Sequence, residues 1–375
     1  MMLAAVLVFW ASPQQGEDLV GLGLRYLARH QAPTGAWGRR QASCDCPAEP
    51  PPPDPAVPAA LVARIDALIA GLDDDDFRRR DQALADLIDI GPPAQPRLRS
   101  AAADGSAEAQ WRAKRALRRI GVLETSEDVE ATSMALLAFL GAGYTQLARP
   151  VSDGTDFGKV VKEGLQWLLA QEGPDGSFEG ANAAAQAWGA LALAEAYGMT
   201  ASAPLKEPAQ KAIDYIVAHP AMNARALFYQ GMALKSAELS ELPFPGAASE
   251  RTVRALAAKR ADEPASIFIR TATQVLQIFT YKTKQRVDLS AALPGIDPCR
   301  MEMETVYAVG LAMFQADGPS GPAWKAYHER LREWIVPGQD HVSGKCERGT
   351  WAAEGTRARI RTSALATLSC EFYYR

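Results

Sequence analysis

The sequence has little cysteine, no excess of positive charge and no long apolar run. Five cysteines in 375 residues are too few for a fold built on disulfides. The 40 Lys and Arg residues are outnumbered by 44 Asp and Glu residues, which leaves no electrostatic attraction to nucleic-acid phosphates. The apolar run near the amino terminus, Leu3–Ala11, is too short to span a bilayer. We therefore predict neither a nucleic-acid partner nor a transmembrane protein.

The usual sequence signatures of catalysis are also missing. The chain has no Gly-x-Ser-x-Gly nucleophile elbow, phosphate-binding loop, His-Glu-x-x-His zinc motif or Cys-Gly-Glu-Gln thioester. Its four histidines are scattered, and we expect each to be a surface or helix-capping residue. These patterns predict no cofactor.

The first residues resemble a signal peptide. The run Leu3–Ala11 has the length of a signal-peptide core, although no basic residue precedes it and Phe9 lies where a small residue should precede the cleavage site. We interpret residues 1–16 as a leader and expect an exported protein, periplasmic or extracellular. The alternatives are a misassigned start and a buried first helix.

Apolar residues recur at three- and four-residue spacing almost throughout, and no run alternates with a period of two. The chain is therefore predicted to be all-α, with helices bounded by Gly, Pro and capping residues. The expected helices are Glu17–Gln31, Ser126–Gly141, Phe157–Gln171, Asn182–Tyr197, Leu205–Ala218, Asn223–Leu239, Ser249–Arg260, Ser266–Tyr281, Gln285–Leu293, Met301–Gln315, Pro322–Val336 and Arg359–Tyr374.

The second helix of each successive pair is the more apolar one. The segment "AQAWGALALAEAYGM" is apolar nearly all round, whereas its partner "DFGKVVKEGLQWLLAQE" keeps a charged face. A helix that is apolar all round is buried on all sides. Residues 17–41 and 122–375 are thus predicted to form an α6/α6 toroid of about six helical hairpins, with the apolar helices inside and the amphipathic helices outside.

Residues 42–121 interrupt this pattern. Residues 42–58 are rich in proline, which predicts an extended linker. Within residues 59–121, "DDDDFRRRDQALADLIDIG" is echoed by "GSAEAQWRAKRALRRIG". Both contain an aromatic, a basic cluster, Ala-Leu and a final Gly, which predicts a HEAT-like helical insert after the first outer helix. Such a module binds partners or packs on its host.

A short motif occurs twice and, in looser form, a third time. The stretches "GLRYLARHQAPTGAWG" and "GLQWLLAQEGPDGSFEG" each place a Gln and an aromatic around a Gly turn, and "LREWIVPGQDHVSGKCERGTW" repeats the elements. Each good copy lies where an outer helix ends, so we predict a stabilising junction with a buried aromatic and a Gln bound to backbone. The residues concerned are Gln31, Trp37, Gln171 and Phe178.

The stretch "EGLQWLLAQEGPDGSF" resembles the Gln–Trp repeat of squalene–hopene cyclases and protein prenyltransferases, the α/α-toroid superfamily. The segments "VGLAMFQADGPSGPAWKAYHERL" and "TSALATLSCEFYYR" are similar to recurring phrases of its uncharacterised bacterial exported branch, which carries prenyltransferase/squalene-oxidase repeats. The resemblance covers residues 17–40 and 123–375. It implies the toroid fold and, if the chain is an enzyme, an isoprenoid substrate.

Two motifs of that superfamily have counterparts here. The run Asp73–Asp76 matches the Asp-x-Asp-Asp acid of the cyclases, but it opens a predicted helix, where carboxylates cap free N–H groups. We interpret it as a cap. Asp297 and Cys299 resemble the Asp-x-Cys zinc ligands of prenyltransferases, and His341 is an imperfect substitute for the missing third ligand. We expect no metal.

The cysteines outside the last helix fall in loops that are neighbours in a closed ring. In an exported protein they are candidates for one or two disulfides, with a metal site or free thiols as alternatives. Cys370 lies in an apolar helix and is expected to be buried. The disulfide candidates are Cys44, Cys46, Cys299 and Cys346.

Inner helices of a toroid begin at one end, so their free N–H groups and positive dipole ends converge there. Arginines and aromatics at that end predict a rim that binds a carboxylate, phosphate or sulfate group. The alternative is that the arginines pair with glutamates and close the mouth. The predicted rim residues are Trp188, Tyr229, Arg270, Tyr307, Trp351 and Arg361, with Arg225, Arg357 and Arg359 nearby.

The missing catalytic signatures and the inserted module favour a non-catalytic binding or scaffold protein. Its partner would be a protein, a lipid or an anionic small molecule. The alternative is an enzyme, either a terpenoid cyclase or prenyltransferase or a glycan-active α6/α6 barrel. Glycan hydrolysis needs two facing carboxylates, and the candidates are Glu130, Glu302 and Glu304.

Overall fold

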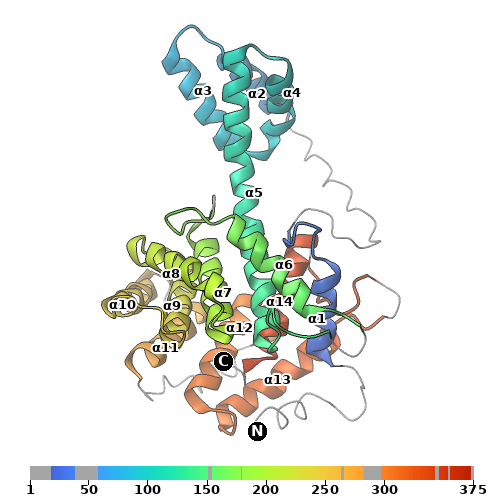
Figure 1. Cartoon of the computed structure of the whole chain (residues 1–375), viewed down its shortest axis with the longest axis vertical. Coiled ribbons are helices and arrows are strands. Elements are labelled where there is room, and N and C mark those ends of the chain that lie inside the picture. The colour runs from blue at the N-terminus through green and yellow to red at the C-terminus, as the bar shows by residue number, and fades with distance from the viewer. Residues whose placement is uncertain are drawn as a thin grey trace. The chain divides into compact units, whose positions relative to one another are not determined.

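The computed structural model describes residues 18–38, 58–150, 154–178, 180–262, 266–282, 297–342, 346–353 and 355–372. Among these residues every regular element is a helix, so the chain is all-α, as predicted (Figure 1). The helices are α1 (Leu19–Arg29), α2 (Ala59–Gly71), α3 (Phe77–Ile90), η1 (Pro92–Ala94), α4 (Gln95–Asp104), α5 (Ala107–Gly141), α6 (Phe157–Ala170), α7 (Ala183–Thr200), α8 (Ala203–Ala218), α9 (Ala224–Leu239), α10 (Ala247–Asp262), α11 (Ile267–Tyr281), η3 (Pro298–Arg300), α12 (Met303–Asp317), α13 (Pro322–Gly338) and α14 (Thr356–Ser369).

The leader at residues 1–16, the Pro-rich linker up to residue 57 and the expected helix Gln285–Leu293 lie outside the described residues. Across the part of the chain that is described, no helix has both the length and the hydrophobicity needed to cross a membrane.

The predicted helix boundary at Ser126 is wrong. A single helix, α5, runs from Ala107 to Gly141 and contains both the last helix expected for the insert and the first expected inner helix. The sequence between them contains no proline, and Gly121 alone weakens a helix by only about 1 kcal/mol relative to alanine. Strong helix formers on both sides therefore outweigh the capping residues near Ser126.

The chain divides into two compact units. Unit 1 consists of residues 1–46, 128–178 and 182–375, and unit 2 consists of residues 47–127 and 179–181. Unit 2 has its own hydrophobic core, to which Leu72, Leu87 and Leu98 contribute side chains without exposed surface. Each unit therefore buries apolar surface of its own, which is the main source of folding free energy.

The aspartates of unit 2 cap a helix, as the sequence favoured. The Asp76 carboxylate accepts a hydrogen bond from the backbone N–H of Arg78 and forms the N-cap of α3. Asp74 accepts a bond from the backbone N–H of Asp76. Both bonds lie on the exposed surface, at the end of the helix where the positive end of its dipole favours a carboxylate.

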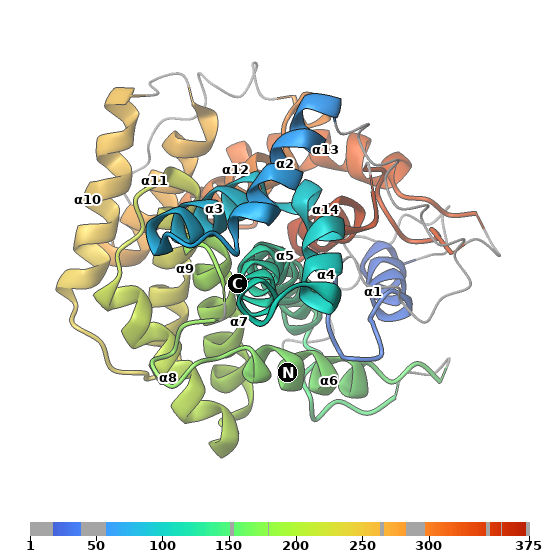
Figure 2. The ribbon, with the colours of Figure 1, turned by 90° about the horizontal axis from the view of Figure 1, so that it is seen from above.

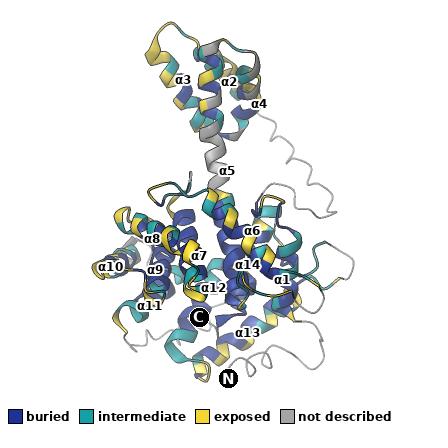
Figure 3. Cartoon of the chain, viewed as in Figure 1, coloured by how far each residue is buried: buried dark blue, intermediate teal, exposed yellow. Residues whose placement is uncertain are grey.

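Unit 1 contains helices of two kinds (Figure 3). In α7, α9, α12 and α14 nearly every residue outside the terminal turns is buried. Helices α6, α8 and α13 bury one face and expose the other. The buried helices carry glycine where a neighbouring ring packs closely: a Cβ at Gly189 would collide with Phe178, and one at Gly310 with Phe372.

The buried helices contact one another in chain order. Helix α7 packs against α9, α9 against α11, α11 against α12, and α12 against α14, which packs in turn against α1. In Figure 2, α9 and α14 lie toward the middle of unit 1, and α8 and α10 lie toward its edge. Helix α8 packs mainly on α7, and α10 packs on both α9 and α11.

Trp37 forms a junction between the end of α1 and α5. Its ring is fully buried, its Nε1 donates to the carbonyl of Leu27 at 2.7 Å, and its backbone N–H donates to Thr132 Oγ1 at 2.9 Å. Phe178 is buried in the corresponding place after α6, and its backbone N–H donates to Gln186 Oε1. Both rings are buried at junctions, as the motif predicts.

Trp351 occupies a third junction of the same design. Its Nε1 donates to the carbonyl of Ile335 at 2.8 Å, and its backbone N–H donates to Ser363 Oγ at 3.2 Å. Trp351 is also one of the predicted rim residues, and its ring is buried between α13 and α14 in the way that Trp37 is buried between α1 and α5.

The motif glutamines bind backbone carbonyls. Gln31 Nε2 donates to the carbonyls of Gly35 and of Val160 in α6, each at 2.9 Å. Gln339 Nε2 donates to the carbonyl of Leu19 in α1 at 2.9 Å. These two residues therefore link α1 to α6 and the end of α13 to α1.

Gln171 makes a different bond from its counterparts. Its Nε2 donates to the carbonyl of Trp167 in its own helix. Gln186, in the first turn of α7, takes over the junction: it accepts from the Phe178 N–H and donates to the Gly176 carbonyl at 2.8 Å. A long amide side chain is still used at this junction, but it comes from the second helix of the pair.

Candidate functional site

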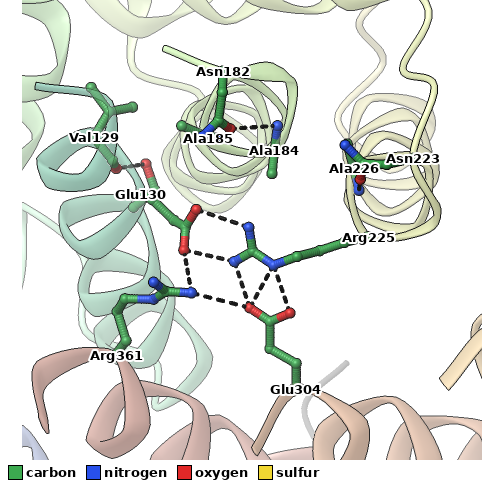
Figure 4. Close-up of polar contacts among 11 residues, drawn as sticks. Val129, Glu130, Asn182, Ala184, Ala185, Asn223, Arg225, Ala226, Glu304 and Arg361 are labelled. Atoms are coloured by element: carbon green, nitrogen blue, oxygen red, sulfur yellow. Dashed lines mark hydrogen bonds and ion pairs between the residues drawn. The ribbon is translucent and has the colours of Figure 1, made fainter. Parts of the chain in front are cut away.

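Two arginines and two glutamates from four helices form an ionic cluster in unit 1 (Figure 4). Arg225 Nη2 of α9 lies 2.6 Å from Glu130 Oε1 of α5 and 2.5 Å from Glu304 Oε1 of α12. Arg361 Nη2 of α14 lies 2.7 Å from Glu130 Oε1 and 3.6 Å from Glu304 Oε1. Each guanidinium therefore bridges both carboxylates.

Helix starts place these side chains. Asn223 caps α9 by accepting from the backbone N–H of Ala226, so Arg225 lies in the first turn. Glu304 lies in the first turn of α12, where the positive end of the helix dipole favours a carboxylate. Glu302 is the N-cap residue of α12, but its side chain makes no capping bond and is exposed.

The two glutamates of the cluster are more deeply buried than the two arginines. The Glu130 side chain is only 5% exposed and that of Glu304 14%, whereas Arg225 and Arg361 are about one-third exposed at 29% and 35%. Burial alone would lower the pKa of Arg225, but its hydrogen bonds to Glu304 and Glu130 outweigh this and raise the pKa above the ordinary value. The two positive and two negative charges cancel. The cluster therefore offers no net positive charge to an added anion.

An aromatic pair lies against this cluster. The Arg225 guanidinium lies 5.9 Å from the centre of the Tyr229 ring, and that ring lies against Trp188 at a tilt of 32° with a centroid separation of 3.8 Å. Tyr229 Oη and Trp188 Nε1 are buried and have no hydrogen-bond partner among the residues that the structure describes. Burial, and then the charge of Glu304, raises the pKa of Tyr229 well above its ordinary value. Tyr229 is therefore a neutral phenol.

The other predicted rim residues do not join the cluster. Arg357 pairs with Asp128 at 2.8 Å. Arg359 lies 3.9 Å from Glu347. Arg270 is half-buried on α11. The ring of Tyr307 stacks on Phe372. Arg357 and Arg359 therefore lie beside carboxylates, as Arg225 and Arg361 do.

The residues that resemble zinc ligands are Asp297, Cys299 and His341. Asp297 Oδ2 lies 3.3 Å from Arg300 Nε. Within the described part of the chain, no group of three or more His, Cys, Asp or Glu side chains is placed to hold a metal ion. His341 is half-buried in the loop after α13, and the side chain of Cys299 lies outside the described residues.

One of the four candidate cysteines, Cys346, is disulfide-bonded. Cys44, Cys46 and the Cys299 side chain lie outside the described residues. Cys370 is a buried free thiol, as expected from its apolar helix, and burial raises its pKa well above the ordinary value.

An apolar cavity of about 410 Å³ is lined by residues from the second halves of α5, α7, α9, α11 and α12, and three of these helices, α5, α9 and α12, also carry the ionic cluster. Two of its lining side chains reach the surface: Met199 is 46% exposed and Leu239 72%. Lys235 lies at its wall, with Nζ 3.0 Å from Glu238 Oε2 and 5.8 Å from the centre of the Phe279 ring. The lining residues are Leu140, Gly141, Gly143, Glu195, Gly198, Met199, Met232, Lys235, Ser236, Leu239, Ser240, Phe279 and Leu311.

This cavity was not predicted from the sequence, although the sequence contains a signal for it. The segments "AYGMT" and "GMALKSAEL" end two apolar helices with small residues and unbranched methionines, and methionine is typical of adaptable apolar surfaces. Comparison with protein-family models, with curated proteins and with solved structures finds no match for this chain.

Proposed function

We propose that this chain is a non-catalytic binding protein built on an α/α toroid, and that it holds an apolar or amphiphilic small molecule in the apolar cavity. The observation that carries the proposal is the cavity itself: about 410 Å³, lined mainly by Leu, Met and Phe side chains. Small-molecule sites usually have volumes of roughly 300–1,000 Å³ and apolar walls with a few polar groups. Lys235, Ser236 and Glu195 are such polar groups here.

The toroid is supported by how the hairpins are linked. Buried helices that neighbour one another in chain order, from α7 to α14, match an inner ring. The Gln31–Val160 and Gln339–Leu19 bonds connect consecutive outer helices and join the last hairpin to the first. The ionic cluster ties α5, α9, α12 and α14 at one end, as expected if those helices begin around a common mouth.

A lipid-like ligand in the cavity suits the charges better than an anion at the opposite mouth. The two arginines there are already neutralised by Glu130 and Glu304. Displacing either carboxylate would leave a buried charge without its partner, which is costly. The apolar cavity imposes no such cost. An apolar ligand that enters it removes apolar surface from contact with water, which is favourable.

One observation favours the alternative that the protein is an enzyme. Glu130 and Glu304 both contact the same nitrogen of Arg225, so their carboxylates lie close enough for paired-carboxylate chemistry. Two guanidiniums hold them, however, and a general acid has to carry a proton. A glycan-active barrel would therefore require substrate to displace Arg225, and a terpenoid cyclase or prenyltransferase would need an acid or a metal elsewhere.

We further propose that the protein is exported and that unit 2 is a HEAT-like module inserted into the toroid. The disulfide at Cys346 supports an oxidising compartment, because disulfides persist there and are rare in the cytosol. The separate core of unit 2 and the repeated α3 and α5 motifs support an independent module.

Titration with an uncharged fluorophore tests the ligand site. N-phenyl-1-naphthylamine should bind the full chain with a saturable rise in emission. Leu239→Asp places a charge at the cavity entrance and should abolish the rise. Leu147→Asp is the matched control, because Leu147 is 70% exposed, close to the 72% of Leu239, but does not line the cavity. Equal binding by both variants would place the fluorophore elsewhere and sink the proposal.

A further inference from the structure

Lys235 is the cation of the apolar cavity wall. Among the described residues that line the cavity, the charged ones are Lys235 of α9 and Glu195 of α7. The Lys235 side chain is only 18% exposed, and its ammonium lies 5.8 Å from the centre of the Phe279 ring, which also lines the cavity. A lysine placed in this way buries its apolar stem and keeps its charge at the polar edge of the wall.

Glu238 holds this ammonium from outside the cavity. Lys235 Nζ lies 3.0 Å from Glu238 Oε2, and Lys282 Nζ lies 2.6 Å from Glu238 Oε1. Glu238 does not line the cavity but a separate groove, together with Glu241. The hydrogen bonds from Lys282 and then Lys235 lower the pKa of Glu238, so its carboxylate is ionised. Two ammonium groups therefore share one carboxylate, which leaves one positive charge over.

Lys235 and its neighbour Ser236 keep donors for a ligand. An ammonium group has three N–H donors, and within the described residues the only hydrogen bond of the Lys235 side chain is the one to Glu238. Ser236 lines the cavity and is 8% exposed, and its hydroxyl makes no hydrogen bond to another described residue. A buried hydroxyl without a partner is unfavourable, so a ligand oxygen beside Ser236 would supply the missing bond.

We propose, building on the binding function proposed above, that the ligand is an acyl-chain amphiphile whose carboxylate head group is held by Lys235 and Ser236. The single positive charge left over at Glu238 matches a head group with one negative charge. A phosphate monoester would bring about 1.5–2 negative charges at neutral pH, which exceeds it. The hydrocarbon chain lies against Leu140 and Leu311, which offer apolar surface without polar groups to satisfy.

Two features of the cavity oppose an anion. Helix α9 ends at Leu239, so its last turn presents the negative end of the helix dipole. This effect comes from partial charges and is weaker than a direct hydrogen bond between an ammonium and a carboxylate. Glu195 repels an anion from the α7 side of the cavity. The head group is therefore expected on the α9 side, beside Lys235.

Three amphiphiles with the same chain and different head groups test the proposal. Laurate, dodecanol and dodecylamine are used at neutral pH to displace N-phenyl-1-naphthylamine from the full chain. Laurate should displace the fluorophore at a concentration about tenfold lower than dodecanol, because it alone gains a bond between two charged groups. Dodecylamine should bind no better than dodecanol, since its ammonium would lie next to that of Lys235.

Four variants separate head-group recognition from cavity shape. Lys235→Met keeps the apolar stem and should weaken laurate to the level of dodecanol without changing dodecanol. Glu238→Gln should strengthen laurate several-fold, because the carboxylate that competes for Lys235 is removed. Ser236→Ala should weaken laurate and dodecanol alike, because both head groups have an oxygen. Lys159→Met is the matched control and should change nothing, because Lys159 also pairs with a glutamate of its own helix but does not line the cavity.

The outcomes distinguish the head group from the cavity. Equal displacement by laurate and dodecanol in the wild type, or tighter binding of dodecylamine, would overturn the carboxylate assignment and leave the cavity as the binding site. Equal weakening of laurate and dodecanol by Lys235→Met would overturn it as well, because Lys235 would then only shape the wall. Failure of the fluorophore and of every amphiphile to bind would instead contradict the binding function on which this inference rests.

Discussion

Trp37 and Trp351 are equivalent residues in two hairpin junctions, and truncating either should cost similar stability. Each ring is buried and donates its Nε1 to a helix-end carbonyl. Trp37→Ala and Trp351→Ala should each lower the free energy of unfolding by about 3–5 kcal/mol, as for a large core truncation. Denaturant unfolding of the full chain measures this. Trp111→Ala is the control, because Trp111 is 50% exposed; a loss at Trp37 no larger than at Trp111 would contradict the junction role.

Glu172 gives the second junction a pH dependence. Burial raises the pKa of Glu172 from 4.5 to about 7, with Lys211 opposing the shift. The unfolded chain loses this proton near pH 4.5 and the folded chain only near pH 7, so the residue's contribution to stability is lost as the pH rises through that window.

Glu172→Ala should therefore raise the melting temperature at pH 8 and leave it nearly unchanged at pH 4. In the first junction, the residue that corresponds to Glu172 is Ala32, which has a short side chain. Glu250→Ala, on the exposed face of α10, should give the same small change at both pH values. An equal effect of Glu172→Ala at pH 4 and pH 8 would show that its carboxyl does not titrate with a raised pKa.

At the residue scale, sequence patterns predicted side chains whose roles are local. A buried aromatic after a Gly turn is specified by the turn itself, which is why Trp37 and Phe178 could be predicted. Which glutamine bonds across the junction depends on the second helix, so Gln186 was missed and Gln171 was given its role.

Among the elements, the ionic cluster joins four helices that are distant in the sequence. Arg225→Ala would leave Glu130 and Glu304, both largely buried, with Arg361 as their shared partner. Because Arg225 is partly exposed, we expect a loss of about 2 kcal/mol, below the 3–5 kcal/mol for a fully buried pair. Differential scanning calorimetry should show the effect as a lower melting temperature.

A control and a rescue accompany this variant. Arg254→Ala breaks an exposed pair with Glu250 on α10 and should cost less than about 0.5 kcal/mol. Adding Glu304→Gln to Arg225→Ala should recover part of the loss, because one uncompensated carboxylate is removed. An additive or larger loss in the double variant would mean that the cluster is not held by charge pairing.

Helix α5 shows what limits prediction at the element scale. Periodicity located both of its halves, but the capping residues near Ser126 suggested a break that the helix does not have. Capping signals are local and weak, contributing about 1 kcal/mol. Continuation of a helix depends on what packs on each side, which the sequence pattern does not contain.

At the scale of the whole molecule, the two units should fold separately. Each has its own core, so replacing residues 47–121 by a Gly/Ser linker of about 20 residues should leave unit 1 folded. Circular dichroism should show a helical protein with one cooperative melting transition. An insoluble or non-cooperative product would show that unit 1 depends on the replaced segment.

The all-α class could be predicted for the whole molecule, because helical periodicity runs through almost all of the chain. The proposed ligand site could not be predicted from the sequence. The ionic cluster and the apolar cavity each combine side chains from helices separated by more than 100 residues. The sequence pattern places arginine, glutamate and methionine residues near the ends of predicted helices. Only the packing decides that the arginines neutralise the glutamates and that the methionines border a cavity.

The most direct test of the proposed binding function is native mass spectrometry of the full chain with palmitate, a single-chain amphiphile. The wild type and Leu147→Asp should each retain a single palmitate at low micromolar concentration, and Leu239→Asp should retain none, since a carboxylate at the entrance of an apolar cavity opposes an acyl chain. Filling the cavity with Ser236→Phe should also abolish retention while Trp37 and the other junctions keep the protein folded. Palmitate retained equally by all four proteins, or by none, would contradict the assignment of the apolar cavity as the ligand site.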